Sequence, residues 1–255
     1  MNTTQPSKQL DGKRPVVVVT GPNKKWRFGW WAARFQLWRV GVRAIYVCPG
    51  SEEHPERLHG IIIGGGDDID PKHYGTAGAA GANYDAARDT LELKMIALAE
   101  QWNLPILGIC RGSQLINVSR NGNLIGDLRP LRRKTPNRNS MRPIKYANIL
   151  SGSQLEGVLH TARLKINSLH NHAVDTVGDN LMAVAHDEDG FIQAIEDPDK
   201  DFMLGVQWHP EYLPFRAPQT RLFNALKQAA ASADDLSTIG TFLSELGGAE
   251  VELAR

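Results

Sequence analysis

Two short stretches far apart in the chain carry residue types that suit covalent catalysis. Cys110 lies in Leu107-Gly108-Ile109-Cys110-Arg111-Gly112, and His209 lies in Gln207-Trp208-His209-Pro210-Glu211. A cysteine flanked by glycines after an apolar run is typical of a thiol held on a tight strand-to-helix turn, because glycine lets neighbouring backbone pass close. An imidazole can activate such a thiol, and a carboxylate can orient the imidazole. We therefore predict Cys110 as nucleophile, His209 as base and Glu211 as the orienting acid.

The spacing of His209 and Glu211 supports this grouping. In an extended segment residues i and i+2 point to the same side, so the carboxylate is expected to reach the imidazole. A lone cysteine is more often a small buried apolar residue, and Cys48 is interpreted in that way. A metal site explains the residues less well, because no second cysteine or histidine lies at ligand spacing from Cys110. We expect no metal and no cofactor.

The first half of the chain alternates predicted strands with predicted helices, which indicates a parallel sheet with helices on both faces. Shorter strands follow in the second half, with a hairpin turn at Asp187-Glu188-Asp189-Gly190. The predicted strands are 16–19, 44–47, 60–63, 105–109, 164–166, 181–185, 192–195 and 203–206, and the predicted helices are 26–40, 89–102, 113–118, 223–231 and 239–246.

Composition places the chain among ordinary globular proteins. It has 255 residues, 42% hydrophobic and 22% charged, and a net charge of +1, so no overall charge recruits nucleic acid or an acidic membrane. Two cysteines and the absence of an apolar leader or of a run of ~18 apolar residues favour a cytoplasmic protein. We predict a polar leader over residues 1–14, one domain over 15–232 and a helical extension over 233–255.

Two segments leave alternatives open. Residues 129–145 hold seven basic residues and no acidic one, which favours a solvated, mobile loop; a lid that draws an anionic substrate to the thiol is the sharper alternative. The tryptophan-rich stretch 26–40 is expected to pack in the core, with a dimer face, and hence a homodimer, as the alternative.

Several motifs, in this order, resemble class I glutamine amidotransferase-like hydrolases, and within them the γ-glutamyl-γ-aminobutyrate hydrolases of putrescine breakdown. The resemblance runs from about residue 16 to about residue 230. It rests on Gly60-Ile61-Ile62-Ile63-Gly64-Gly65-Gly66-Asp67, Asp70-Pro71-Lys72-His73-Tyr74-Gly75, Arg88-Asp89-Thr90-Leu91-Glu92, the cysteine turn with Gln114 and Asn117, Asn167-Ser168-Leu169-His170, and Gly205 to Glu211.

The resemblance implies a flavodoxin-like three-layer α/β sandwich with a mostly parallel central sheet and a nucleophile elbow. It also implies hydrolysis of a γ-glutamyl amide through a cysteinyl thioester. The oxyanion hole would be formed by backbone N–H groups of Gly65, Gly66 and Arg111, which fits the physics of a glycine loop and a helix start. The glutamyl group would be bound by Gln114 and by Ser168, Leu169 and His170.

The chain departs from the family pattern in places that leave the amine uncertain, including the tryptophan-rich stretch and His172. One rival activity is a glutaminase subunit that passes ammonia to a separate synthetase, and cleavage of a folate poly-γ-glutamate tail is a weaker one. The rival from another class is a catalytically silent binding protein on the same scaffold. The expected partner is a small γ-glutamyl substrate, with no nucleic acid and no membrane.

Overall fold

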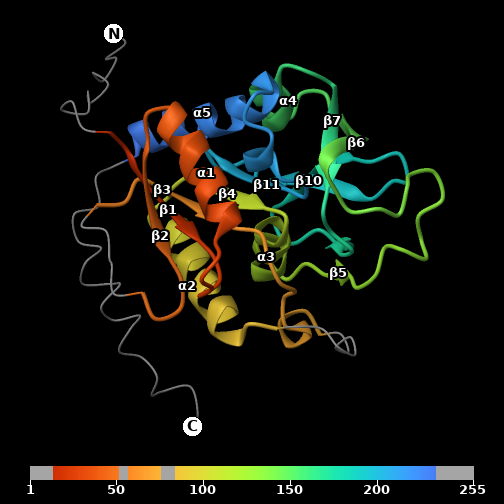
Figure 1. Ribbon diagram of the computed structural model, residues 1–255, viewed down its shortest axis with the longest axis horizontal. Coiled ribbons are helices and arrows are strands. Elements are labelled where there is room, and N and C mark those ends of the chain that lie inside the picture. The colour runs from red at the N-terminus through yellow and green to blue at the C-terminus, as the bar shows by residue number, and fades with distance from the viewer. Residues whose placement is uncertain (1–13, 52–56, 76–83, 234–255) are drawn as a thin grey trace.

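A central sheet with helices on both faces organises the computed structural model, which describes residues 14–51, 57–75 and 84–233 (Figure 1). Within these residues the sheet has nine strands in the order β2-β1-β3-β4-β11-β10-β9-β6-β7. The strands are β1 Val16–Thr20, β2 Arg43–Val47, β3 Gly60–Ile63, β4 Ile106–Ile109, β6 Ser140–Ile149, β7 Arg163–Ser168, β9 Met182–His186, β10 Ile192–Glu196 and β11 Met203–Val206, and a separate pair joins β5 Leu124–Ile125 to β8 Ala173–Val174.

Half of the sheet is parallel, from β2 through β1, β3 and β4 to β11, and the remaining pairings are antiparallel. Every residue of β1, β3, β4 and β11 is buried, as their continuous apolar runs predict for strands covered on both faces. The carboxyl ends of parallel strands meet at one edge, where loops can gather side chains from several strands. This edge carries the candidate site.

Helices α1 and α5 cover one face of the sheet, and α2 and α3 cover the other (Figure 1). Leu37 and Phe223 pack on the first face, and Met95 and Leu115 on the second. The predicted α/β sandwich is confirmed, and the predicted elements of the first half are found within a few residues of their expected ends. The helices are α1 Phe28–Arg39, α2 Ala86–Gln101, α3 Arg111–Ser119, α4 Gln154–Leu159 and α5 Ala217–Ser232, with short 3-10 turns η1 Pro71–His73 and η2 Pro210–Tyr212.

The core position expected for the tryptophan-rich stretch is wrong for most of its rings. Only Ala33, Gln36 and Leu37 of α1 are buried. The helix lies against the sheet with small and aliphatic side chains, which leaves the large rings on its outer face. The exposed rings are Trp26, Phe28, Trp31, Phe35 and Trp38.

The basic segment is a mostly exposed loop over residues 129–139, as its composition predicts, but two of its seven cations are buried. Residues from Ser140 onward belong to β6, and Arg132 and Lys145 are buried. Arg132 is bound by Asp187 at 2.9 Å, and the carboxylate of Asp189 accepts from the backbone N–H groups of Arg133, Lys134 and Thr135 at 2.6 to 3.0 Å. The predicted hairpin turn therefore pairs with Arg132 and anchors the loop, although the two segments are far apart in the sequence.

Some predictions fall outside the described residues, namely the leader up to residue 13 and the helix over 239–246. Within residues 14–51, 57–75 and 84–233, no helix has the length and apolarity needed to cross a bilayer.

Candidate active site

Cys110 occupies a strained turn between β4 and α3. Its φ is 53° and its ψ is −104°, a backbone conformation that side-chain-bearing residues rarely adopt and that is found at functional turns. A Cβ on Gly112 would lie 2.0 Å from the carbonyl oxygen of Ile63, and one on Gly108 would lie 2.7 Å from the backbone nitrogen of Ser113. Glycine is therefore required on both sides, as the sequence pattern predicts.

The thiol and the imidazole are neighbours because their strands are neighbours. β11 pairs in parallel with β4, with Val206 opposite Ile109, so the residues that follow both strands emerge at the same edge. The side chains of His209 and Cys110 lie close enough for the sulfur to raise the pKa of the imidazole. Both also lie against Gly65, where a Cβ would be 2.7 Å from His209 Cε1 and 3.5 Å from Cys110 Cβ.

Glu211 completes the group, by a different local geometry from the one predicted. Its Oε1 lies 2.7 Å from His209 Nδ1, and both side chains are buried. The segment is not extended, however: Pro210–Tyr212 forms the 3-10 turn η2, with His209 at its N-cap. The proline starts this turn, and the turn brings the carboxylate back beside the ring. The structure thus places Cys110, His209 and Glu211 together.

The imidazole is fixed in position and favoured in its charged form. Asn167 clamps its backbone, accepting from the His209 N–H at 2.8 Å and donating to its carbonyl at 2.9 Å, while the Tyr212 ring stacks on the imidazole at 5.2 Å. Burial alone would lower the pKa of His209, but the carboxylate of Glu211 and the sulfur of Cys110 hold that pKa well above its usual value.

Gln207 is a contact of the thiol that sequence reasoning missed. Its Nε2 donates to the Cys110 sulfur at 3.5 Å, and its Oε1 accepts from Gln114 Nε2 at 2.9 Å. The signal was available, because Gln207 precedes His209 at the same two-residue spacing that relates His209 to Glu211. Gln114 is buried and is held by Gln207 and the His172 carbonyl.

The glycine loop after β3 is oriented by Arg88. Arg88 Nη2 donates to the carbonyl oxygens of Gly64 at 2.9 Å and Gly65 at 3.0 Å. Both peptide bonds are trans, so the N–H groups that share them, those of Gly65 and Gly66, point away from Arg88. The Cβ direction of Gly66 is closed by Arg88 Nη1 at 2.4 Å, which only glycine tolerates at its φ of 147°.

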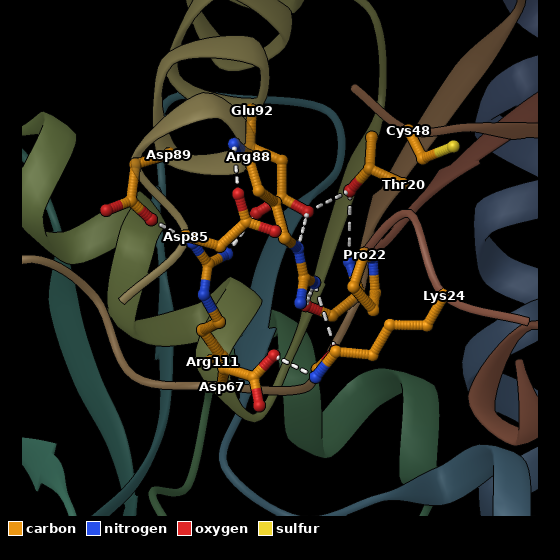
Figure 2. Close-up of polar contacts among 12 residues, drawn as sticks. Thr20, Pro22, Lys24, Cys48, Asp67, Asp85, Arg88, Asp89, Glu92 and Arg111 are labelled. Atoms are coloured by element: carbon orange, nitrogen blue, oxygen red, sulfur yellow. Dashed lines mark hydrogen bonds and ion pairs between the residues drawn. The ribbon is translucent and has the colours of Figure 1, made fainter. Parts of the chain in front are cut away.

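A buried network of two arginines and two carboxylates links this loop to the nucleophile turn (Figure 2). Glu92 accepts from Arg88 Nε at 2.8 Å and from the Thr20 hydroxyl at 2.7 Å, and it pairs with Arg111, as does Asp89. The four charged side chains are 0 to 2% exposed. Burial alone would raise the pKa of Glu92, but the guanidinium groups of Arg111 and Arg88 hold that pKa below its usual value.

This network gives a structural reason for the Arg-Asp-x-x-Glu motif at residues 88–92. Its carboxylates hold the side chain of Arg111, the residue after Cys110, while Arg88 holds the glycine carbonyls. Arg111 is also the first residue of α3, so its N–H has no acceptor within the helix. The network therefore fixes the peptides of Gly65 and Gly66 through the carbonyl oxygens that Arg88 binds, and it fixes Arg111 through its side chain. The motif was recognised in the sequence, but this role was not.

The three expected glutamyl contacts on and after β7 have different surroundings. Ser168 is buried and its hydroxyl accepts from Lys145 Nζ at 3.0 Å. Burial and the charge of Arg132 lower the pKa of Lys145 to about 8. His170 lies 2.8 Å from the His172 carbonyl, and burial lowers its pKa to about 3, so its ring is neutral at physiological pH. Leu169 lines a cavity with the thiol.

That cavity, of about 310 Å³, opens beside the thiol at the ends of the parallel strands. Cys110, His209, Glu211 and the glycines 64–66 line its floor. A small substrate in this cavity would bring a carbonyl group against sulfur, imidazole and glycine backbone together.

Comparisons with known proteins identify the family of this chain. The sequence profile of Peptidase C26 matches residues 50–211, the stretch that includes the glycine loop, Cys110, His209 and Glu211. The chain belongs to the Peptidase C26 family. A Peptidase C26 match is consistent with a hydrolase, and with the class I glutamine amidotransferase-like resemblance of its motifs.

Relatives and solved structures extend the Peptidase C26 assignment. A Mycobacterium tuberculosis protein named "Putative glutamine amidotransferase Rv2859c" is 32% identical over 240 residues, which cover 87% of this chain and 77% of that protein. The γ-glutamyl-γ-aminobutyrate hydrolase PuuD of Escherichia coli is 30% identical over 166 residues, covering 61% of this chain and 65% of that protein. The crystal structure of a glutamine amidotransferase from Thermotoga maritima shares the fold, with a TM-score of 0.56 and 16% identity over 86% of this chain and 96% of that chain.

Proposed function

We propose that this protein is a cysteine-dependent hydrolase that cleaves the γ-glutamyl amide bond of a small γ-glutamyl compound, such as γ-glutamyl-γ-aminobutyrate or a related γ-glutamyl amine, to glutamate and the free amine. One observation carries the proposal: Cys110 stands on a strained turn beside a buried His209–Glu211 pair, at the floor of a cavity. The E. coli relative supplies the substrate class, since its name states that activity.

The reaction proceeds in two steps on these residues. The Cys110 thiolate attacks the γ-carbonyl carbon, and the imidazolium of His209 gives its proton to the amine nitrogen as the C–N bond breaks and a thioester remains. Neutral His209 then takes a proton from water, the hydroxide attacks the thioester, and the C–S bond breaks to release glutamate and the thiolate. Glu211 stabilises the charged imidazole through its 2.7 Å contact with Nδ1.

The developing oxyanion is stabilised by backbone N–H groups of Gly65, Gly66 and Arg111. The fixed glycine peptides and the start of α3 support this role, since preorganised donors need no rearrangement as charge develops. The loss of one such donor typically costs ~3 kcal/mol of transition-state stabilisation.

The glutamyl end is assigned to the side of the site formed by α3 and the end of β7. Gln114 is buried and already pairs with Gln207, which contacts the thiol. The backbone from Ser168 to His170 follows Asn167, the residue that clamps His209. Lys145, a buried cation bonded to Ser168, gives this side a positive group suited to the α-carboxylate of a glutamyl substrate.

A glutaminase subunit is the second candidate function, favoured by the relatives that are named as glutamine amidotransferases. A glutaminase would release ammonia from free glutamine and deliver it to a synthetase. The two activities share the thioester chemistry and differ only in the amine that leaves, so structure at the leaving-group side separates them.

A panel of substrates tests the proposal. We expect glutamate release from γ-glutamyl amides to exceed release from glutamine, and Cys110→Ala to abolish release while its thermal unfolding stays close to that of the parent protein. A glutamine-derived electrophile, 6-diazo-5-oxonorleucine, should add mass at Cys110 in the parent protein and not in the variant. Full activity of a folded Cys110→Ala protein, or no turnover of any γ-glutamyl amide by the parent, would contradict the proposal.

A further inference from the structure

Four aromatic rings form one wall of the cavity that contains the thiol. They come from the loop before α1, from α1 and from β2, and we refer to them as the aromatic wall. The aromatic wall consists of Trp26, Phe28, Trp30 and Tyr46.

The aromatic wall has two half-buried inner rings and two exposed outer rings. The rings of Trp30 and Tyr46 pack at 5.3 Å, and both are half-buried. The Tyr46 hydroxyl donates to the Pro22 carbonyl at 2.7 Å, which holds the ring in place. Trp26 and Phe28 stack on each other at 6.2 Å and are 64% and 65% exposed. Contiguous exposed apolar patches of this kind mark interaction sites or ligand-binding grooves.

In the order of the sheet, the strands of the aromatic wall and of the expected glutamyl contacts lie on opposite sides of β4, and Leu169, which follows β7, lines the cavity together with the wall. Across the sheet, β2 and β1 stand on one side of β3 and β4, and β7 stands at the far edge. Tyr46 belongs to β2, and Ser168 is the last residue of β7. A substrate whose γ-carbonyl meets Cys110 and whose glutamyl end reaches toward β7 therefore extends its amine portion toward the aromatic wall.

The charges around the cavity restrict the amine further. Among the described residues that line it, Glu211 is the one acidic side chain, and it is bound to His209. Arg27 lines the same cavity, with its guanidinium 4.4 Å from the centre of the Tyr46 ring. No acidic residue occurs between Lys24 and Arg43. An amine portion with a second positive charge, as in a polyamine, would meet cations and no free carboxylate.

From this placement we infer that the aromatic wall binds the leaving amine and that, among the γ-glutamyl amides of the proposed function, the site prefers those of ring-bearing amines without a second positive charge to those of open-chain amines such as γ-aminobutyrate. The inference rests on the proposed function and names the substrate class of the same site. Ring-on-ring contacts in offset or edge geometry add attraction beyond area burial, and the four rings of the aromatic wall line the same cavity as the thiol. Ammonia, the leaving group of glutamine, would make no contact with the aromatic wall.

The test compares two substrates whose amines share an N–CH2 group and differ in what it carries, a phenyl ring or a propyl chain. γ-Glutamyl benzylamide and γ-glutamyl butylamide both release an alkyl-type primary amine, so their intrinsic reactivities are similar. We expect the parent protein to show a kcat/KM about tenfold or more higher for the benzylamide, on the scale of one buried aromatic contact. Trp30→Ala and Tyr46→Ala should each lower this ratio about fivefold or more.

Matched variants keep the test decisive. Trp38→Ala removes a ring from the same helix that is 63% exposed and does not line this cavity, and it should leave the ratio unchanged. If Trp30→Ala fails to fold in a thermal melt, Trp26→Ala on the exposed rim takes its place, with an expected drop of about threefold. Equal rates for the two substrates, or equal losses in the Trp38 variant, overturn the inference while hydrolysis itself stands. No turnover of the benzylamide overturns the inference, and only the absence of turnover of every γ-glutamyl amide in the panel overturns the proposed function as well.

Discussion

Replacement of Arg88 by lysine tests whether the buried network positions the oxyanion donors. Lysine keeps the positive charge near Glu92 but cannot present the planar set of donors that reaches the Gly64 and Gly65 carbonyls together. The two glycine peptides then lose the contacts that hold their N–H groups on the side away from residue 88. Thiol, imidazole and glutamyl contacts remain in place.

The expected loss of transition-state stabilisation follows from the two oxyanion N–H donors, those of Gly65 and Gly66, that Arg88 positions. The loss of a whole oxyanion donor costs roughly 2.7–4 kcal/mol, but the loop is still held at Gly64 N by the Thr20 hydroxyl at 3.3 Å. We therefore expect a partial loss of about 1.4–2.8 kcal/mol, which is a fall in kcat of about 10- to 100-fold. KM should change little, because the glutamyl end contacts other elements.

The assay pairs steady-state glutamate release with the rate of Cys110 alkylation by iodoacetamide, which needs the thiolate and not the oxyanion hole. Alkylation should stay within about twofold of the parent rate while kcat falls. Arg120→Lys is the matched control, since Arg120 binds Glu100 at 2.6 Å and Asp197 at 3.2 Å away from the cavity. A folded Arg88→Lys protein with parental kcat would refute the positioning argument.

Three further predictions concern the same site. Gly65→Ala places a methyl group 2.7 Å from His209 Cε1 and should lower kcat at least about tenfold, whereas Gly126→Ala, whose Cβ meets nothing within 4 Å, should not. Glu211→Gln removes the charge that raises the pKa of His209, so the alkaline limb of the kcat/KM profile should move to lower pH; an unmoved limb would contradict the pairing. The folded-state pKa of Glu92 is depressed, so its contribution to stability is present above its ordinary value of 4.5 and is lost as the pH falls below it. Glu92→Gln should therefore lower the free energy of unfolding by about 3 kcal/mol at pH 7 and flatten its fall in acid, as measured by urea titrations from pH 7 to pH 3.

The sequence alone was enough for the features that depend on local pattern. Continuous β-branched runs are stable only when buried on both faces, so the parallel strands and their helices could be placed to within a few residues. The glycines at 108 and 112 likewise predicted the cysteine turn, since only they avoid clashes with Ser113 and Ile63. The motif order predicted the family.

Pairings across the chain required the tertiary structure. Arg132 is buried in an ion pair with Asp187, which composition does not reveal because the two residues are far apart in the sequence. Most rings of the tryptophan-rich stretch are exposed, because burial depends on which face of the helix meets the sheet. Gln207 reaches the thiol, and Glu211 reaches His209 through a 3-10 turn instead of an extended segment. The sequence determined which groups can do chemistry. Only the pairing of β4 with β11, and the contact of Arg88 with the glycine loop, decided how their atoms meet. The reason is that charge pairing and hydrogen bonding act over a few ångströms in space, whatever the separation along the chain.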